Sequence, residues 1–152
     1  MFSNIFENRT TILYILPFFL GAISVISFQP FNFSFINFII FPILFLLIVY
    51  VRKKSKNVYR KKPYYLNLFL IGLTFGFGFF LSGIFWISYS LTFDESFKIL
   101  IPFAIFLIPL FLSLFFAFTI LFVGQFIERN FQSILLFSAA LSICDFLRGK
   151  LF

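Results

Sequence analysis

The chain has 152 residues, of which 62% are hydrophobic and only 11% charged, and it carries a net charge of +7. Charged residues make up about a quarter of an ordinary soluble domain, so the composition excludes that class and predicts an integral membrane protein. The basic charge does not predict nucleic-acid binding, because more than half of the 12 Lys and Arg residues lie in one short segment, Arg52 to Lys62, between apolar runs.

The first third of the chain predicts a hairpin of two membrane-spanning helices. Residues 11–51 carry no charge, which is a length of about two crossings at roughly 20 residues each. Pro30 lacks an N–H and disfavours helix at the residue before it, so we expect a turn there. The expected helices cover residues 11–28 and 33–51, and the positive-inside rule places the basic segment after them in the cytoplasm.

The rest of the chain predicts three more helices, over residues 66–91, 97–126 and 131–147. Asp94 and Glu95 separate the third helix from the fourth and are expected on the outer side. The sequence therefore predicts an all-α, polytopic helical membrane protein. It has about five transmembrane helices, a cytoplasmic N-terminus, and all 152 residues in a single transmembrane domain.

Small residues line one side of the third expected helix. Gly72, Gly76 and Gly83 fall on a narrow stripe, and the four-residue spacing of the first two permits close backbone approach to a neighbouring helix. This stripe predicts a packing face. Trp86 and Tyr89, near the far end, allow a second interpretation, contact with a lipid or a substrate, although both residue types also prefer the membrane interface.

Asp145 and Arg148 are the ionisable residues closest to membrane depth. Three residues apart, they share a helix face and can pair. One interpretation is a structural ion pair at the outer end of the fifth helix. The other is that Arg148, with Lys150, holds a lipid phosphate at the outer surface.

Residues with catalytic or metal-binding chemistry are scarce. The chain has no histidine and one cysteine, Cys144, which stands in an apolar run and is expected to be an inert small hydrophobe. The sequence predicts no disulfide within the chain, no metal site, no cofactor and no set of catalytic residues.

Several short motifs occur in order along the chain. They are Gly21-Ala22, Phe28-Gln-Pro-Phe31, Gly76-Phe-Gly78, Ser82-Gly83-Ile-Phe-Trp86, Ser88-Tyr-Ser90 and Phe146-Leu-Arg-Gly149. In this order and spacing, the chain resembles the N-terminal membrane region of bacterial apolipoprotein N-acyltransferase. The family usually has Glu where Asp145 stands.

The resemblance implies a multi-pass protein of the bacterial inner membrane that takes part in lipoprotein biosynthesis. The implied reaction transfers an acyl chain from a phospholipid to an enzyme cysteine, and then to the amino group of the N-terminal diacylglyceryl-cysteine of a lipoprotein. The family's catalytic Glu, Lys and Cys belong to a nitrilase-like domain that this chain does not include, and Cys144 does not match the catalytic cysteine's motif. We expect an N-terminal fragment, inactive alone, with membrane phospholipids as partners and the lipoprotein engaged through the missing domain.

Two other functions remain compatible with the residues. A small scaffold or assembly subunit would use the glycine stripe as its partner face. A channel or transporter subunit is less favoured, because charge is nearly absent from the expected spans.

Overall fold

The described part of the chain is almost entirely helical. The computed structural model describes residues 10–28, 31–58, 63–90 and 101–151, without the side chains at 54–58, 63–64, 85–90 and 101. In chain order the elements are η1 (Thr11–Ile15), α1 (Leu16–Ser24), η2 (Val25–Ser27), α2 (Phe35–Val58), α3 (Pro63–Ser90), α4 (Ile101–Gly124) and α5 (Phe131–Leu151). These residues contain no strand, and the predicted all-α class is confirmed.

Three of the described helices are long and apolar enough to cross a membrane, over Phe35–Lys53, Tyr65–Ile84 and Pro102–Gly124. The segment Thr11–Ser27 is apolar but shorter, and α5 ends in a turn with Arg148 and Lys150. The chain is a membrane protein. The expected number of crossings stays a prediction.

The helix α2 continues beyond the apolar run that predicts it. The sequence suggests an end at Val51, whereas the helix runs on through the basic residues to Val58. The reason is local, because Lys and Arg are good helix formers and no Gly or Pro occurs between Pro42 and Pro63. The basic residues thus extend a helix out of the apolar zone.

The turn between the first two helical segments uses a left-handed residue. Asn32 has a φ of 56°, a conformation that Asn tolerates better than most side chains. Its N–H donates to the Phe28 carbonyl at 3.0 Å, and the Phe33 N–H donates to the Ile26 carbonyl at 3.2 Å. These bonds reverse the chain before α2 begins.

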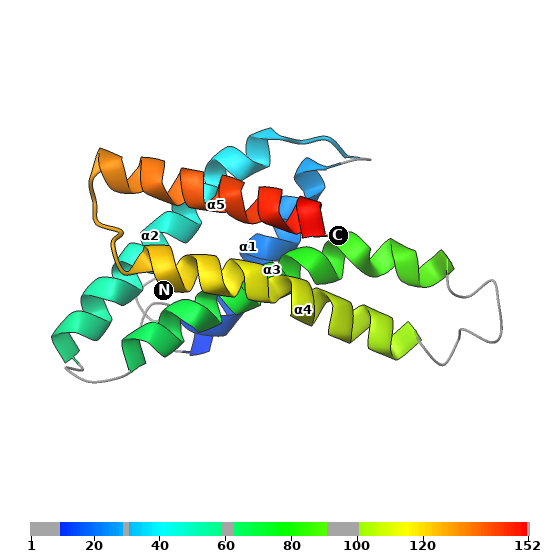
Figure 1. Cartoon of the computed structure of the whole chain (residues 1–152), viewed down its shortest axis with the longest axis horizontal. Helices are drawn as coiled ribbons and strands as arrows, with labels where there is room; N and C mark the ends of the chain where they lie inside the picture. Colours follow the sequence, from blue (N-terminus) through cyan, green and yellow to red (C-terminus); the bar gives the residue numbers. More distant parts are fainter. Residues whose placement is uncertain (1–9, 29–30, 59–62, 91–100, 152) are drawn as a thin grey trace, which may run out of the picture.

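The helix α3 is the centre of the bundle. It has its most extensive contacts with α4 on one side and with α1 on another, and Figure 1 shows α3 and α4 running alongside each other in the long direction of the molecule. The side chains of Phe75, Leu68 and Ile71 on α3 are at most 1% exposed, as are those of Leu44 and Ile48 on α2. The buried core therefore surrounds the middle of α3.

A threonine of α3 lies within hydrogen-bond distance of a carbonyl oxygen in the π-helical turn before Pro17. Pro17 has no N–H, so it cannot donate to the Leu13 carbonyl four residues earlier. The Thr74 hydroxyl lies 3.0 Å from that carbonyl oxygen and also 2.7 Å from the Leu70 carbonyl of its own helix. This contact ties the π-helical turn η1 to α3.

Candidate functional site

Two glycines of α3 let α4 approach closely. A Cβ atom on Gly72 would lie 2.6 Å from the Ala117 Cα, and one on Gly76 would lie 2.9 Å from the Ser113 Cα. Ala117 and Ser113 are themselves small and fully buried. The backbones of α3 and α4 therefore meet where both helices carry small residues, as close packing in a membrane requires.

A second pair of glycines joins α3 to α1, and sequence reasoning did not find it. A Cβ atom on Gly21 would overlap the Phe75 carbonyl oxygen, and one on Gly78 would overlap the Phe18 carbonyl oxygen. Gly83, which the sequence placed with Gly72 and Gly76, has more room, because its nearest neighbour would be Val25 Cγ2 at 3.8 Å. The glycines of α3 thus face two helices rather than one.

The aromatic candidates Trp86 and Tyr89 belong to the last turns of α3. Their side chains lie outside the described residues. Their contact with a lipid or a substrate therefore stays a prediction from the sequence.

Asp145 and Arg148 form an ion pair near the C-terminal end of α5. Their Oδ1 and Nη1 atoms are 3.3 Å apart, and the side chains are 55% and 27% exposed. The Arg148 guanidinium also lies over the ring of Phe80 in α3, 5.1 Å from the ring centroid. Arg148 therefore links α5 to α3.

Lys150 does not join this arrangement. Residues two apart on a helix are about 200° apart around its axis, so Lys150 and Arg148 begin on nearly opposite sides of α5. Lys150 is exposed, whereas Arg148 is half-buried. A phosphate group held by both cations, the interpretation that the sequence suggested, does not follow from this placement.

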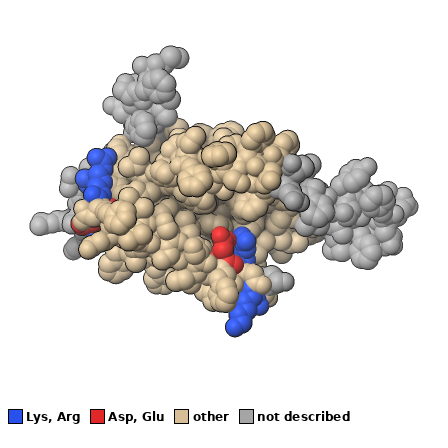
Figure 2. All heavy atoms as spheres, turned by 90° about the horizontal axis from the view of Figure 1, so that it is seen from above, with Lys and Arg blue, Asp and Glu red and all other residues tan. Residues whose placement is uncertain are grey.

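The described charged side chains fall into two groups. One group, Arg52, Lys53, Glu128 and Arg129, lies at the C-terminal part of α2 and the turn after α4, and the other consists of Asp145, Arg148 and Lys150. Figure 2 shows charged side chains in two separate places on the face drawn, one at an end of the molecule and the other near the middle of its long axis, with uncharged residues between them.

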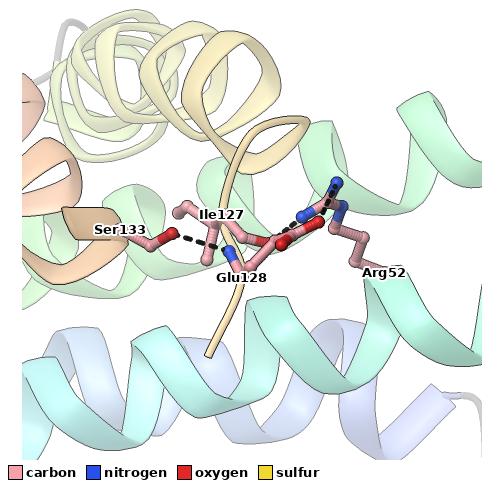
Figure 3. A network of polar contacts seen from close by, with 4 residues as sticks. All are labelled: Arg52, Ile127, Glu128 and Ser133. Atoms are coloured by element: carbon pink, nitrogen blue, oxygen red, sulfur yellow. Dashed lines mark hydrogen bonds and ion pairs between the residues drawn. The ribbon is translucent and has the colours of Figure 1, made fainter. Parts of the chain in front are cut away.

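A network of polar contacts connects the first group (Figure 3). The Arg52 guanidinium donates from Nη1 to the Ile127 carbonyl oxygen, and its Nη2 lies 3.4 Å from Glu128 Oε1. The Glu128 N–H donates to Ser133 Oγ at 2.9 Å. The contacts fix the turn between α4 and α5 against α2. A pairing across 75 residues of sequence has no local signal, so sequence reasoning missed it.

We expect the Arg52→Met variant to lower stability by about 1–2 kcal/mol, because Arg52 is 18% exposed and its loss leaves the Ile127 carbonyl without its donor. Thermal unfolding in detergent, followed by labelling of the buried Cys144 with a thiol-reactive fluorophore, measures this change.

The Glu128→Gln variant should cost less than about 1 kcal/mol, since Glu128 is 61% exposed and an exposed ion pair contributes little. Lys53→Met is the matched control, because Lys53 is an exposed neighbour on the same helix. A fall as large in the Lys53 variant as in the Arg52 variant would show that loss of positive charge, rather than the contact with Ile127, matters.

The described residues offer little else for chemistry. Cys144 is buried and free, and among the described residues no group of three or more His, Cys, Asp or Glu side chains could hold a metal ion. A groove of about 310 Å³ on α2 is lined by Asn37, Phe38, Phe41 and Pro42. Its walls are apolar, which suits hydrocarbon rather than a polar reaction.

The chain is similar to one protein family over most of its length. Residues 20–152 match the family described as the apolipoprotein N-acyltransferase N-terminal domain. No solved structure matched the chain significantly.

Individual relatives bear the name apolipoprotein N-acyltransferase. The protein of Brucella melitensis is 30% identical over 137 residues, which cover 89% of this chain and 25% of the relative. That of Rhodopseudomonas palustris is 33% identical over 132 residues, 86% of this chain and 24% of the relative. That of Bradyrhizobium diazoefficiens is 35% identical over 130 residues, 85% of this chain and 23% of the relative. The chain thus spans about a quarter of the length of these relatives.

Proposed function

Because the chain belongs to the family of the apolipoprotein N-acyltransferase N-terminal domain, we propose that it forms the membrane part of such an enzyme. The proposed reaction transfers an acyl chain from a phospholipid to the N-terminal diacylglyceryl-cysteine of a lipoprotein. The match over residues 20–152 carries this proposal. The chain itself anchors the catalytic part and shapes the place where lipid enters, and it is inactive alone.

The composition of the bundle supports this division of labour. Three helices are long and apolar enough to cross a membrane, and the described charged side chains are few and gather in two groups. A phospholipid substrate must reach the reaction without exposing its acyl chains to water, which apolar helices beside the active site allow.

The proposed location is the bacterial inner membrane, with several crossings and a cytoplasmic N-terminus. The contact between Arg52 and the turn after α4 supports this orientation, because it brings the basic end of α2 to the same side as that turn. Two helices, α3 and α4, run between these points in the chain, so an even number of crossings returns the chain to the cytoplasmic side, where basic residues gather.

The residues proposed to contact lipid or substrate are Trp86, Tyr89, Asp145 and Arg148. Trp86 and Tyr89 are in the last turns of α3, and Asp145 and Arg148 are near the end of α5. Under the proposed orientation, α3 ends toward the outer surface, and α5 ends nearer the middle of the long axis (Figure 1).

A chimera tests the proposed function. Residues 20–152 of this chain replace the matching region of the Brucella melitensis relative, and acyl transfer from a phospholipid to a synthetic diacylglyceryl-cysteine peptide is measured in membranes. We expect the chimera to transfer acyl chains and the isolated chain to transfer none.

Two controls make the result decisive. A chimera with Gly78→Leu should be inactive, because it disrupts the packing of α1 on α3, and immunoblotting of membranes verifies insertion. An inserted, folded but inactive chimera without that change would favour a scaffold function, and acyl transfer by the isolated chain would contradict its proposed dependence on a catalytic domain.

A further inference from the structure

Arg148 is held in place but poorly satisfied as a hydrogen-bond donor. Its Nη1 atom is 3.3 Å from Asp145 Oδ1, yet this buried nitrogen makes no hydrogen bond. A guanidinium has five N–H groups, and buried donors without acceptors are costly. The pair is therefore close in distance but wrong in direction. Because Nη1 is buried, it meets another acceptor only when the Arg148 side chain turns.

An aromatic ring of α3 lies beneath the guanidinium of Arg148. The ring of Phe80 is 5.1 Å from the guanidinium carbon, and Phe80 is only 6% exposed, so the ring belongs to the rigid core of α3. The Arg148 side chain is 27% exposed although its Nη1 atom is buried, so its other atoms reach the surface. A guanidinium at a surface can bind an anion through two oxygens.

The acceptor that suits this guanidinium is a phosphate. Arg pairs with phosphate in a bidentate way, and Arg148 is 27% exposed near the C-terminal end of a helix in a membrane protein. At a membrane surface, the phosphodiesters of phospholipids are the abundant anions of this shape. Charge complementarity and the abundance of these lipids therefore favour a lipid headgroup over other anions.

We propose that Arg148 binds the phosphodiester of a phospholipid and that Asp145 holds the guanidinium when no lipid is bound. Asp145 is 55% exposed, so its carboxylate can turn to water when the phosphate takes its place. The proposal rests on the proposed function only for the use of that lipid as acyl donor. Binding itself is measured without acyl transfer, so either idea can fail while the other stands.

The test measures lipid binding to the full chain in detergent micelles by native mass spectrometry. The probes are phosphatidylglycerol, a diacylglycerol with the same acyl chains and no phosphate, and inorganic phosphate. We expect phosphatidylglycerol to bind more tightly than diacylglycerol. Arg148→Gln should weaken the binding of phosphatidylglycerol, but not of diacylglycerol, by about tenfold, which corresponds to the loss of a charged hydrogen bond.

Asp145→Asn gives the signature that a purely structural ion pair would not. If the carboxylate competes with the phosphate for Arg148, its removal should tighten phosphatidylglycerol binding about threefold, in line with the strength of an exposed pair. Arg129→Gln removes an exposed cation from the other charged group and should change nothing.

Three results would overturn the proposal. The first is that Arg148→Gln and the parent chain bind phosphatidylglycerol equally well. The second is that Asp145→Asn binds this lipid as the parent chain does or more weakly. The third is that inorganic phosphate binds as tightly as the lipid, which would make the site a general anion site. The helical circular dichroism signal and its loss on heating check that each variant is folded, because Cys144 neighbours Asp145 and its labelling would respond to these substitutions directly. If Arg148→Gln does not fold, the Asp145→Asn result decides alone.

Discussion

Replacing Gly78 by Ala is expected to separate α1 from α3 and to lower the stability of the domain by about 3 kcal/mol. The added Cβ would overlap the Phe18 carbonyl oxygen and lie 3.0 Å from the Phe18 carbonyl carbon. These are backbone atoms of a packed helix, so no side-chain rotation relieves the overlap. A loss of this size lowers the melting temperature by roughly 10 °C in a chain of this length, measured by thermal labelling of Cys144 in detergent.

Two other glycines provide matched controls, because an added Cβ there should not lower the stability of the domain. A Cβ on Gly83 would meet only Val25 Cγ2, at 3.8 Å, and a Cβ on Gly149 would meet nothing within 4 Å. Because Ala is a better helix former than Gly by about 1 kcal/mol, Gly83→Ala and Gly149→Ala should leave stability unchanged or raise it slightly. Equal destabilisation by all three substitutions would refute the close approach at Gly78.

The contrast between these glycines shows how far the sequence could predict helix packing. The spacing of Gly72 and Gly76 is a local signal, and both glycines lie against α4. Gly78 is on another side of the same helix, and its partner Phe18 is sixty residues away in the sequence. The spacing of residues within α3 carries no information about such a distant partner. The sequence grouped Gly83 with the first two because periodicity gives a direction but not the neighbour in that direction.

The contacts of the charged residues also differ in how far the sequence could predict them. Asp145 and Arg148 are three residues apart, so their pairing could be predicted from helical geometry alone. Arg52 meets Ile127 and Glu128 only because α3 and α4 return the chain to the end of α2. Phe80 beneath Arg148 is another partner from a distant helix. Local pairs were predictable, and contacts between distant helices required the fold.

The helix class and order were predictable for a different reason. Long uncharged runs in a membrane protein have few structural alternatives, because backbone groups in lipid must bond within the segment. The ends were less predictable. The run that predicts α2 stops at Arg52, but helix formation depends on backbone propensity as well as hydropathy, and the helix continues to Val58.

The second large effect is expected at Phe75, the aromatic residue at the centre of the bundle. Phe75 is 1% exposed, and its ring centroid lies 5.5 Å from that of Phe116 on α4 and 6.4 Å from that of Phe41 on α2. Phe75→Ala removes contacts with two helices at once and leaves a cavity that protein surrounds. We expect a loss of about 3 kcal/mol, measured by the same thermal labelling of Cys144.

Phe122→Ala is the matched control for the loss of stability expected in Phe75→Ala. Phe122 is on α4 and 64% exposed, so lipid or detergent fills the space that its ring leaves, and the variant should lose less than about 0.5 kcal/mol. Both rings have apolar surroundings, so transfer out of water contributes little to the difference between the two variants. The difference therefore measures how much better protein packs around Phe75 than lipid does around Phe122. A cost for Phe122→Ala as large as that for Phe75→Ala would mean that protein covers this face of α4 in the detergent-solubilised state.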